Sequence, residues 1–138
     1  FDELDGIQSR LLDIGSAVAT PLTRSSESKL QRTVFDEGGG STQQLEAWMD
    51  AMDTELPPLR NFILPSGGVA SASLHLARAI CRRAERSVVP LCVDGECDAS
   101  AGIYLTRLRD YLFVSARFVS VRGGHVEVPY RKGAAGVD

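Results

Sequence analysis

The pattern of apolar and polar positions predicts four long helices joined by polar segments. Apolar residues recur at steps of three and four over residues 1–20, 41–56, 71–89 and 98–121. Pro21, the pair Pro57-Pro58 and Pro90 end the first three helices, and Gly123-Gly124 closes the fourth. The fold class predicted is all-α, with the helices in an antiparallel bundle. Only the tail, residues 125–130, alternates like a short edge strand.

Local signals place the helix starts and the longest loop. Ser41 and Gln44 have the spacing of a capping box, and Asp98 is a favourable N-cap for the last helix. Residues 22–40 are polar and are expected to form a long loop. The last helix is apolar on more than one side, which indicates a central position in the bundle or a subunit interface.

The apolar side chains of the middle helices are expected to form the core. In the second helix we expect a core role, and not a cofactor box, for Leu45, Trp48, Met49 and Met52. In the third helix the predicted buried side consists of Leu74, Ala77, Ile80, Cys81, Ala84 and Val88. Cys81 is therefore interpreted as a small core residue and not as a nucleophile.

Composition limits the class of protein. The 138 residues are 43% hydrophobic and 24% charged, which is ordinary for one soluble domain with a core. Three cysteines argue against a disulfide framework and for a reducing compartment, and no His/Cys cluster has the spacing of a zinc site. No apolar run is long enough to span a membrane, and the N-terminal residues show no signal-peptide or transit-peptide pattern.

Four arginines gather on the third predicted helix. Arg78, Arg82, Arg83 and Arg86 lie within nine positions, with Glu85 among them. Residues 1–77 hold 5 basic and 11 acidic residues, whereas residues 78–138 hold 10 basic and 7 acidic ones. Guanidinium forks suit phosphate oxygens, so this row indicates a local polyanion site. A nucleic-acid surface would normally make the whole domain basic, and the alternative to a site is a solvated charged face.

The segments around this helix offer further candidate residues. Ser66-Gly67-Gly68 precedes its N-terminus and is either an ordinary turn or a backbone that a ligand approaches closely. Phe62, in the preceding loop, is either a core anchor or an aromatic group that faces a ligand ring.

Thr106 and Asp110 share one face of the last helix. Asp110 either orients an arginine of the neighbouring helix or forms a surface pair with Arg107. His75 has apolar neighbours and is interpreted as a packed histidine. No Ser/His/Asp or Cys/His arrangement can be assembled, so the residues favour binding and electrostatic positioning of phosphates over acid–base catalysis.

Several motifs together resemble one family, the PduO-type ATP:cob(I)alamin adenosyltransferases. They are Phe62-Ile-Leu-Pro-Ser-Gly-Gly68, Ala72-x-Leu74-His75-x-x-Arg78, Cys81-Arg-Arg-Ala-Glu-Arg86 and Arg107-Leu-x-Asp-Tyr-Leu-Phe113. The segments Asp13-Ile-Gly-Ser-Ala-Val-Ala-Thr-Pro21 and Leu56-Pro-Pro-Leu59 also fit, so the resemblance covers about residues 1–131.

The resemblance implies a five-helix bundle that assembles as a homotrimer with sites between subunits. It implies an enzyme that moves the 5′-deoxyadenosyl group of ATP, bound with Mg²⁺, to the cobalt of cob(I)alamin. Triphosphate leaves, and cobalamin is a substrate and itself the nucleophile. A cobalamin reductase and an adenosylcobalamin-dependent enzyme are implied as partners, in the cytoplasm or, in a eukaryote, the mitochondrial matrix. No nucleic acid or membrane partner and no protein-bound metal site are expected.

By matched position, the resemblance also implies residue roles. The ATP-binding residues would be Arg82, Arg83, Ala84, Glu85, Arg86 and Thr106. Within this set Arg82 and Arg86 hold the phosphates and Glu85 fixes the two arginines, while Asp110 orients the site. Phe62, Ser66 and Arg78 would face cobalamin, with Phe62 below the corrin, where it helps to displace the lower axial ligand. The implied catalytic residues are Arg78, Arg82 and Glu85.

Two departures from the family pattern leave alternatives open. The N-terminal ATP loop of the family and its first helix, with the acid that pairs with Arg78, match no segment here, so residues 1–138 are expected to be an N-terminally incomplete single domain. Thr106 stands where the family commonly has Asn, and a hydroxyl lacks the two-sided contact of an amide. The alternatives are a non-catalytic helical module that binds nucleotides or corrinoids, and a plain oligomeric scaffold.

Overall fold

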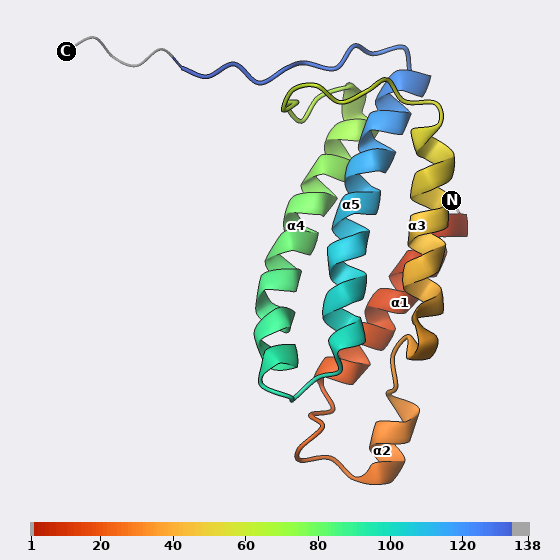
Figure 1. Cartoon of the computed structure of the whole chain (residues 1–138), viewed down its shortest axis with the longest axis vertical. Coiled ribbons are helices and arrows are strands. Elements are labelled where there is room, and N and C mark those ends of the chain that lie inside the picture. Colours follow the sequence, from red (N-terminus) through yellow and green to blue (C-terminus); the bar gives the residue numbers. More distant parts are fainter. Residues whose placement is uncertain (1, 134–138) are drawn as a thin grey trace, which may run out of the picture.

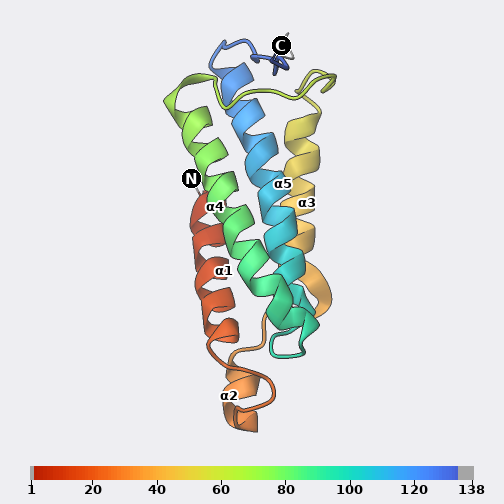
Figure 2. The ribbon, with the colours of Figure 1, turned by 90° about the vertical axis from the view of Figure 1, so that its left-hand side faces the viewer.

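The computed structural model describes residues 2–133 and shows an antiparallel helical bundle. The helices are α1 (Asp2–Val18), α2 (Glu27–Arg32), α3 (Gly40–Asp53), α4 (Gly68–Val93) and α5 (Ala99–Arg122), with a short 3₁₀ turn at Glu37–Gly39. In Figure 1, α5 runs between α4 and α3, and Figure 2 shows the same bundle from the side. Helix α1 lines a shared depression with α3 and with Tyr104 of α5. The all-α fold class and the four long helices predicted from the sequence are confirmed. Phe1 and residues 134–138 of the predicted domain lie outside the described residues.

Helix α5 forms the centre of the bundle, as its apolar pattern predicted. It packs against both α4 and α3. Its buried residues are Ala101, Gly102, Tyr104, Leu105, Leu108, Tyr111, Leu112, Ser115, Ala116, Arg117 and Ser120. The predicted N-cap is also confirmed, because the Asp98 carboxylate accepts a hydrogen bond from the Ser100 amide at 2.9 Å. The hydroxyl group of Tyr111 donates to Glu3 at 2.6 Å and so links α5 to α1.

Helix α4 is longer than its sequence pattern predicted. It continues through Pro90 to Val93, so the prediction that Pro90 ends the helix is wrong. Proline removes one backbone donor, but the last turn stays helical because Leu91 and Cys92 pack against the core and the Asp94 amide donates to Pro90 O at 2.9 Å. The predicted core is confirmed for Cys81 and Val88. It is wrong for Ile80 and Ala84, which are exposed.

The predicted capping box at the start of α3 is replaced by a cap from outside the helix. Helix α3 begins at Gly40, before Ser41, and Asp36 stands in a left-handed conformation with φ 44°. The Asp36 carboxylate accepts from the amide groups of Ser41 at 2.6 Å and Thr42 at 3.1 Å. Burial alone raises the pKa of Asp36, but these hydrogen bonds outweigh it and lower the pKa below 3.8. Part of the predicted loop 22–40 also folds, as α2.

The tail lies against the loop between α3 and α4 instead of forming a strand. The Leu64 amide donates to Val128 O at 2.8 Å, and the Tyr130 amide donates to Phe62 O at 2.7 Å. Ile63 and Pro129 form an isolated antiparallel bridge, and no strand is present among residues 2–133. In both views this loop and this tail lie at the same end of the bundle, where α5 ends. No helix of the described part is both long and apolar enough to cross a membrane.

The cap gives a test of the α3 boundary. We expect Asp36→Ala to lower the free energy of unfolding by about 1–2 kcal/mol, because the amide groups of the first turn lose their acceptor. Asp36→Asn keeps an acceptor and should recover part of this loss, and Glu37→Ala, a change at the exposed neighbour, is the control. Urea unfolding measures all three variants.

The pH dependence of the same variants tests the charge of the cap. The pKa of Asp36 is lowered in the folded state, so its carboxylate stabilises the fold above the ordinary value of 3.8. This contribution is lost as the pH falls through the lowered folded pKa. The stability difference between the natural chain and Asp36→Asn should therefore shrink in acid, and a difference independent of pH would contradict the capping role of the charge.

Candidate functional site

Three of the arginines predicted to bind phosphate lie exposed along one edge of α4. Arg82, Arg83 and Arg86 line an open depression of about 420 Å³ together with Ala79 and Ser87. Among residues 2–133, none of these three guanidinium groups forms an ion pair or a hydrogen bond to another side chain. Positive charge that the chain itself leaves unneutralised is what a polyanion requires. Ala84 is also exposed but does not line the depression.

Glu85 does not pair with the arginine row, which corrects the expected role of this residue. Its Oε1 atom accepts from the hydroxyl group of Thr106 at 2.9 Å, and its Oε2 atom accepts from Nη1 of Arg109 at 3.1 Å. Its side chain is only 14% exposed. Positions 82 and 86 differ from 85 by about 100° or less around the helix, but only position 85 faces α5. Glu85 therefore holds two side chains of α5, Thr106 and Arg109, in place.

Asp110 remains on its own helix and does not orient an arginine of α4. Its carboxylate lies 3.6 Å from Nη1 of Arg107 and 3.9 Å from Nε of Arg109. Nε of Arg107 lies 2.9 Å from Glu46 of α3, so this surface network joins α5 to α3. The alternative of an Arg107–Asp110 surface pair is thus the one that the structure shows.

Arg78 occupies a different environment from the other arginines. Its guanidinium carbon lies 4.7 Å from the centre of the Phe113 ring, a cation–π contact. His75, which is 7% exposed, meets the same ring edge-on at 6.1 Å. Burial and the nearby charge of Arg78 lower the pKa of His75, so the imidazole is held neutral and packed, as predicted. Phe113 thus forms a platform that fixes Arg78.

Phe62 is presented to solvent instead of anchoring the core. It is 85% exposed and lines an open depression of about 490 Å³ with Leu59, Arg60, Asn61 and Tyr130. The hydroxyl group of Ser66, in the same loop, donates to Leu64 O at 3.0 Å. An exposed aromatic ring on a loop held by backbone hydrogen bonds is available to a flat ligand.

The glycines that follow this loop allow close packing of α4 against α5. Gly67 has φ 92°, and a Cβ atom there would lie 2.2 Å from the Ser120 hydroxyl oxygen. The hydroxyl group of Ser71, fully buried one turn later, donates to Ala116 O at 2.8 Å. Gly67 is thus explained by helix packing, which agrees with the alternative of an ordinary turn.

The predicted site residues form two groups within one chain. The depressions around Phe62 and around Arg82 share no lining residue, and the helix rises about 21 Å from Gly68 to Arg82. Arg78 lies between the two groups on α4. The chain thus offers an aromatic surface at one end and a cationic surface farther along the same helix.

The sequence reasoning missed Arg109, which holds Glu85, and Arg117, which is buried. Arg109 lies three positions after Thr106, so helical spacing was a signal that both side chains share the face toward Glu85. No comparable signal marked Arg117, because its partners come from the loop and the tail.

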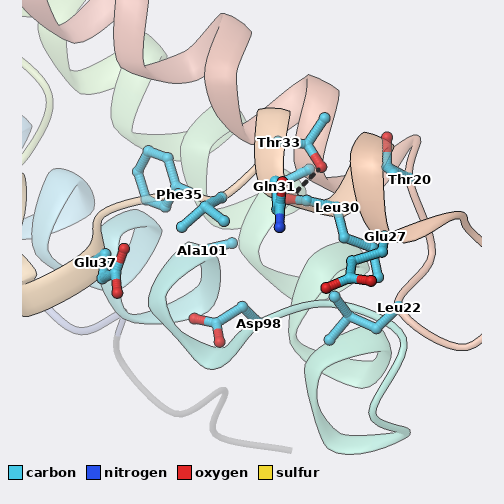
Figure 3. Close-up of a pocket in the computed structure, with 12 residues that line it drawn as sticks. Thr20, Leu22, Glu27, Leu30, Gln31, Thr33, Phe35, Glu37, Asp98 and Ala101 are labelled. Atoms are coloured by element: carbon cyan, nitrogen blue, oxygen red, sulfur yellow. Dashed lines mark hydrogen bonds between the residues drawn. The ribbon is translucent and has the colours of Figure 1, made fainter.

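A pocket that is more enclosed than the depressions around Phe62 and Arg82 lies at the end of the bundle opposite the Phe62 loop. It has a volume of about 350 Å³ and lies between the end of α1, α2 and the start of α5. Figure 3 shows its apolar lining at Leu22, Leu30 and Phe35, with the carboxylates of Glu27, Glu37 and Asp98 around it. None of the predicted site residues lines this pocket.

The fold and the site define a helical bundle with an exposed row of unpaired arginines and an exposed aromatic loop. The family model for cobalamin adenosyltransferase matches residues 1–119. The chain therefore belongs to the cobalamin adenosyltransferase family. It is 50% identical to the corrinoid adenosyltransferase MMAB of Mus musculus over 131 residues, which is 95% of this chain and 54% of that protein.

Other relatives give the same family. The corrinoid adenosyltransferase of Bacillus subtilis is 40% identical over 132 residues, covering 96% of this chain and 64% of that one. Among solved structures, a variant of the PduO-type ATP:corrinoid adenosyltransferase from Lactobacillus reuteri, complexed with cobalamin and ATP, superposes with a TM-score of 0.82 at 33% identity. That match covers 95% of this chain and 70% of the other. The chain spans about half the length of the mammalian relatives.

The site geometry predicts that the exposed arginines of α4 contribute little to stability, whereas Glu85 on the same helix contributes substantially. We expect Arg82→Ala to change the free energy of unfolding by less than about 0.5 kcal/mol, because this guanidinium is exposed and unpaired within residues 2–133. Glu85→Ala should cost about 2 kcal/mol, since Arg109 and Thr106 lose their common acceptor. Urea unfolding compares the two, with Arg83→Ala as a second exposed control. Equal losses for Arg82→Ala and Glu85→Ala would show that the row is structural.

Proposed function

We propose that the protein to which this chain belongs transfers the 5′-deoxyadenosyl group of ATP to the cobalt of cob(I)alamin. The observation that carries the proposal is the row of Arg82, Arg83 and Arg86, exposed and unpaired among the described residues of a chain of this family. In the transfer, a cobalt–carbon bond forms with the electron pair of cob(I)alamin. The bond between C5′ and the phosphate oxygen breaks, and triphosphate leaves with the electron pair of that C5′–O bond.

The arginine row acts on the leaving group. Arg82 and Arg86 bind the phosphates, and Arg83 and the backbone at Ala84 complete the ATP side, with Mg²⁺ bound to the triphosphate. Negative charge gathers on the triphosphate as the bond to C5′ breaks, so guanidinium groups bound to its oxygens stabilise the transition state more than the ground state. The reactive electron pair comes from the corrinoid, so the chain needs no general base.

Glu85 and Thr106 form a surface beside the nucleotide, and the hydrogen bond between them holds both side chains in place. The Thr106 hydroxyl has one hydrogen, and both of its contacts, Glu85 Oε1 at 2.9 Å and Gly102 O at 3.0 Å, are acceptors. The hydroxyl group therefore offers ATP only its lone pairs. In this proposal Glu85 positions Thr106 and Arg109, and Asp110 positions Arg107 and Arg109.

Phe62, Ser66 and Arg78 make the corrinoid side in this proposal. The ring of Phe62 is exposed and free to lie below the corrin, where it helps to displace the lower axial ligand. The contact of Arg78 with Phe113 holds its guanidinium in one orientation. The solved relative complexed with cobalamin and ATP supports the pairing of these two ligands in one fold.

One observation favours a second candidate, a non-catalytic module that binds nucleotides or corrinoids. Thr106 has its only hydrogen engaged within the chain, so it cannot donate to ATP as an amide would. ATP binding without turnover by the full-length protein would favour this module. Both candidates use the same arginine row.

We further propose a homotrimer with sites between subunits, in a reducing compartment, the cytoplasm or the mitochondrial matrix. Exposed apolar side chains support the association, including Leu12 on α1, Leu76 on α4 and Ile103 on α5, each more than half exposed. The three free thiols agree with the compartment. A cobalamin reductase that supplies cob(I)alamin and an enzyme that uses adenosylcobalamin are the partners that this chemistry requires.

Turnover tests the proposed activity directly. Full-length protein mixed with cob(I)alamin and MgATP should produce the absorption spectrum of adenosylcobalamin. Arg82→Ala should lower kcat by about 100-fold or more, because the triphosphate loses a fixed charge in the transition state. Arg32→Ala, an exposed arginine of α2, is the matched control and should be unaffected. A normal rate for Arg82→Ala would remove the phosphate role, and no product from confirmed cob(I)alamin would end the proposal.

The assembly has its own test. Sedimentation equilibrium of the full-length protein should give three times the mass of the monomer, because contacts between copies cover the exposed apolar side chains of α1, α4 and α5. The same mass should persist in high salt, since apolar contacts are not screened. A monomeric mass at the concentrations used for turnover would contradict the trimer.

A further inference from the structure

Among residues 2–133, Arg117 is the one buried arginine, and it lies outside the proposed substrate contacts. Arg117, on α5, has a side chain that is only 5% exposed. Its Nε and Nη2 atoms donate to the two carboxylate oxygens of Glu127, and Nη2 also donates to Pro57 O at 2.8 Å. A buried guanidinium needs such compensation, because an unpaired charge in the interior is strongly destabilising.

These contacts join three segments that are distant in the sequence. Pro57 begins the loop that leads from α3 to α4, and Glu127 belongs to the tail after α5. Arg117 thus fixes the start of the loop and the start of the tail to the central helix through one planar group. Lysine cannot reproduce this arrangement, because a single ammonium does not present a fork of parallel donors.

The tail in turn holds the loop segment that carries Phe62. Immediately after Glu127, Val128 O accepts from the Leu64 amide at 2.8 Å, and the Tyr130 amide donates to Phe62 O at 2.7 Å. Most side chains of these two paired segments are exposed, with Phe62 at 85% and Tyr130 at 53%, while Ile63 is partly buried. Two short paired segments with so little burial are only marginally stable by themselves. The contact depends on its attachment to the bundle.

We infer that Arg117 and Glu127 are positioning residues that hold the loop of Phe62 in place for the corrinoid. Arg117 holds Glu127 through their ion pair. The backbone that follows Glu127, at Val128 and Tyr130, is hydrogen-bonded to the backbone of Leu64 and Phe62. The inference rests on the proposed function for its kinetic consequence. Its structural part, the order of the loop, stands independently of any activity.

Hydrogen exchange of the full-length protein tests the structural part. In Glu127→Gln, amide exchange in peptides that cover residues 59–65 and 126–131 should accelerate by about tenfold or more, because local opening no longer breaks a charge-assisted contact. Arg117→Lys should accelerate the same peptides. The matched controls are Glu55→Gln and Arg122→Lys, which alter the exposed pair that joins the turn after α3 to the end of α5. These controls should leave both peptides unchanged.

Kinetics of the same variants test the consequence for substrate. We expect kcat/KM for the corrinoid to fall by about tenfold in Glu127→Gln, while KM for ATP stays within about twofold, because only the corrinoid side is displaced. Phe62→Ala is the reference for loss of the ring, and it should not alter exchange in the tail peptide. Arg117→Lys keeps the charge and should retain more activity than Arg117→Met. Thermal unfolding by circular dichroism identifies any variant that fails to fold, and Glu127→Gln, at a partly exposed position, is the conservative choice.

The outcomes are distinct. Unchanged exchange in both peptides of Glu127→Gln would overturn the inference. Equal effects on the ATP and corrinoid parameters would also overturn it, since they indicate a general loss of structure. If the natural protein forms no adenosylcobalamin, the proposed function fails, and the exchange measurements alone then decide the structural role of Arg117.

Discussion

The burial of helix α5 is the constraint on which the rest of the structure depends. A helix enclosed on most sides must find a partner for each polar side chain it carries into the interior. Tyr111 finds Glu3 of α1, Thr106 and Arg109 share Glu85 of α4, and Arg117 reaches Glu127 of the tail. No buried side-chain nitrogen or oxygen among residues 2–133 lacks a partner. The polar groups of α5 therefore determine how the surrounding segments are placed.

The outer edge of α4 has the opposite property. Its arginines are left without partners among the described residues, whereas the inward side of the same helix satisfies its polar groups. One side of this helix thus packs into the bundle, while the other side presents unpaired positive charge to solvent. This division explains why Glu85, although it lies in the middle of the arginine motif, packs against α5 and contacts Thr106 and Arg109.

Sequence reasoning reached the fold class, the four long helices and the Asp98 cap, because helical periodicity and capping are local properties. It failed where a distant residue decides the outcome. Asp36 replaced the predicted capping box from outside α3, and core contacts carried α4 through Pro90. At the site, residue types identified the arginine row, but the side of α4 that faces α5 decided the partner of Glu85. The family resemblance, confirmed by the family match over residues 1–119, supplied what spacing did not.

The contact between Gly67 and Ser120 has a further consequence for how the molecule tolerates change. A side chain at position 67 has no room, since its first carbon would lie 2.2 Å from the Ser120 oxygen. Any larger residue would push the first turn of α4 away from the last turns of α5, and α4 would tilt about its packed middle. The displacement would be greatest at the loop of Phe62 and smallest near Arg82. Crowding at position 67 would therefore alter the position of the Phe62 loop while leaving the arginines near the middle of α4 almost in place.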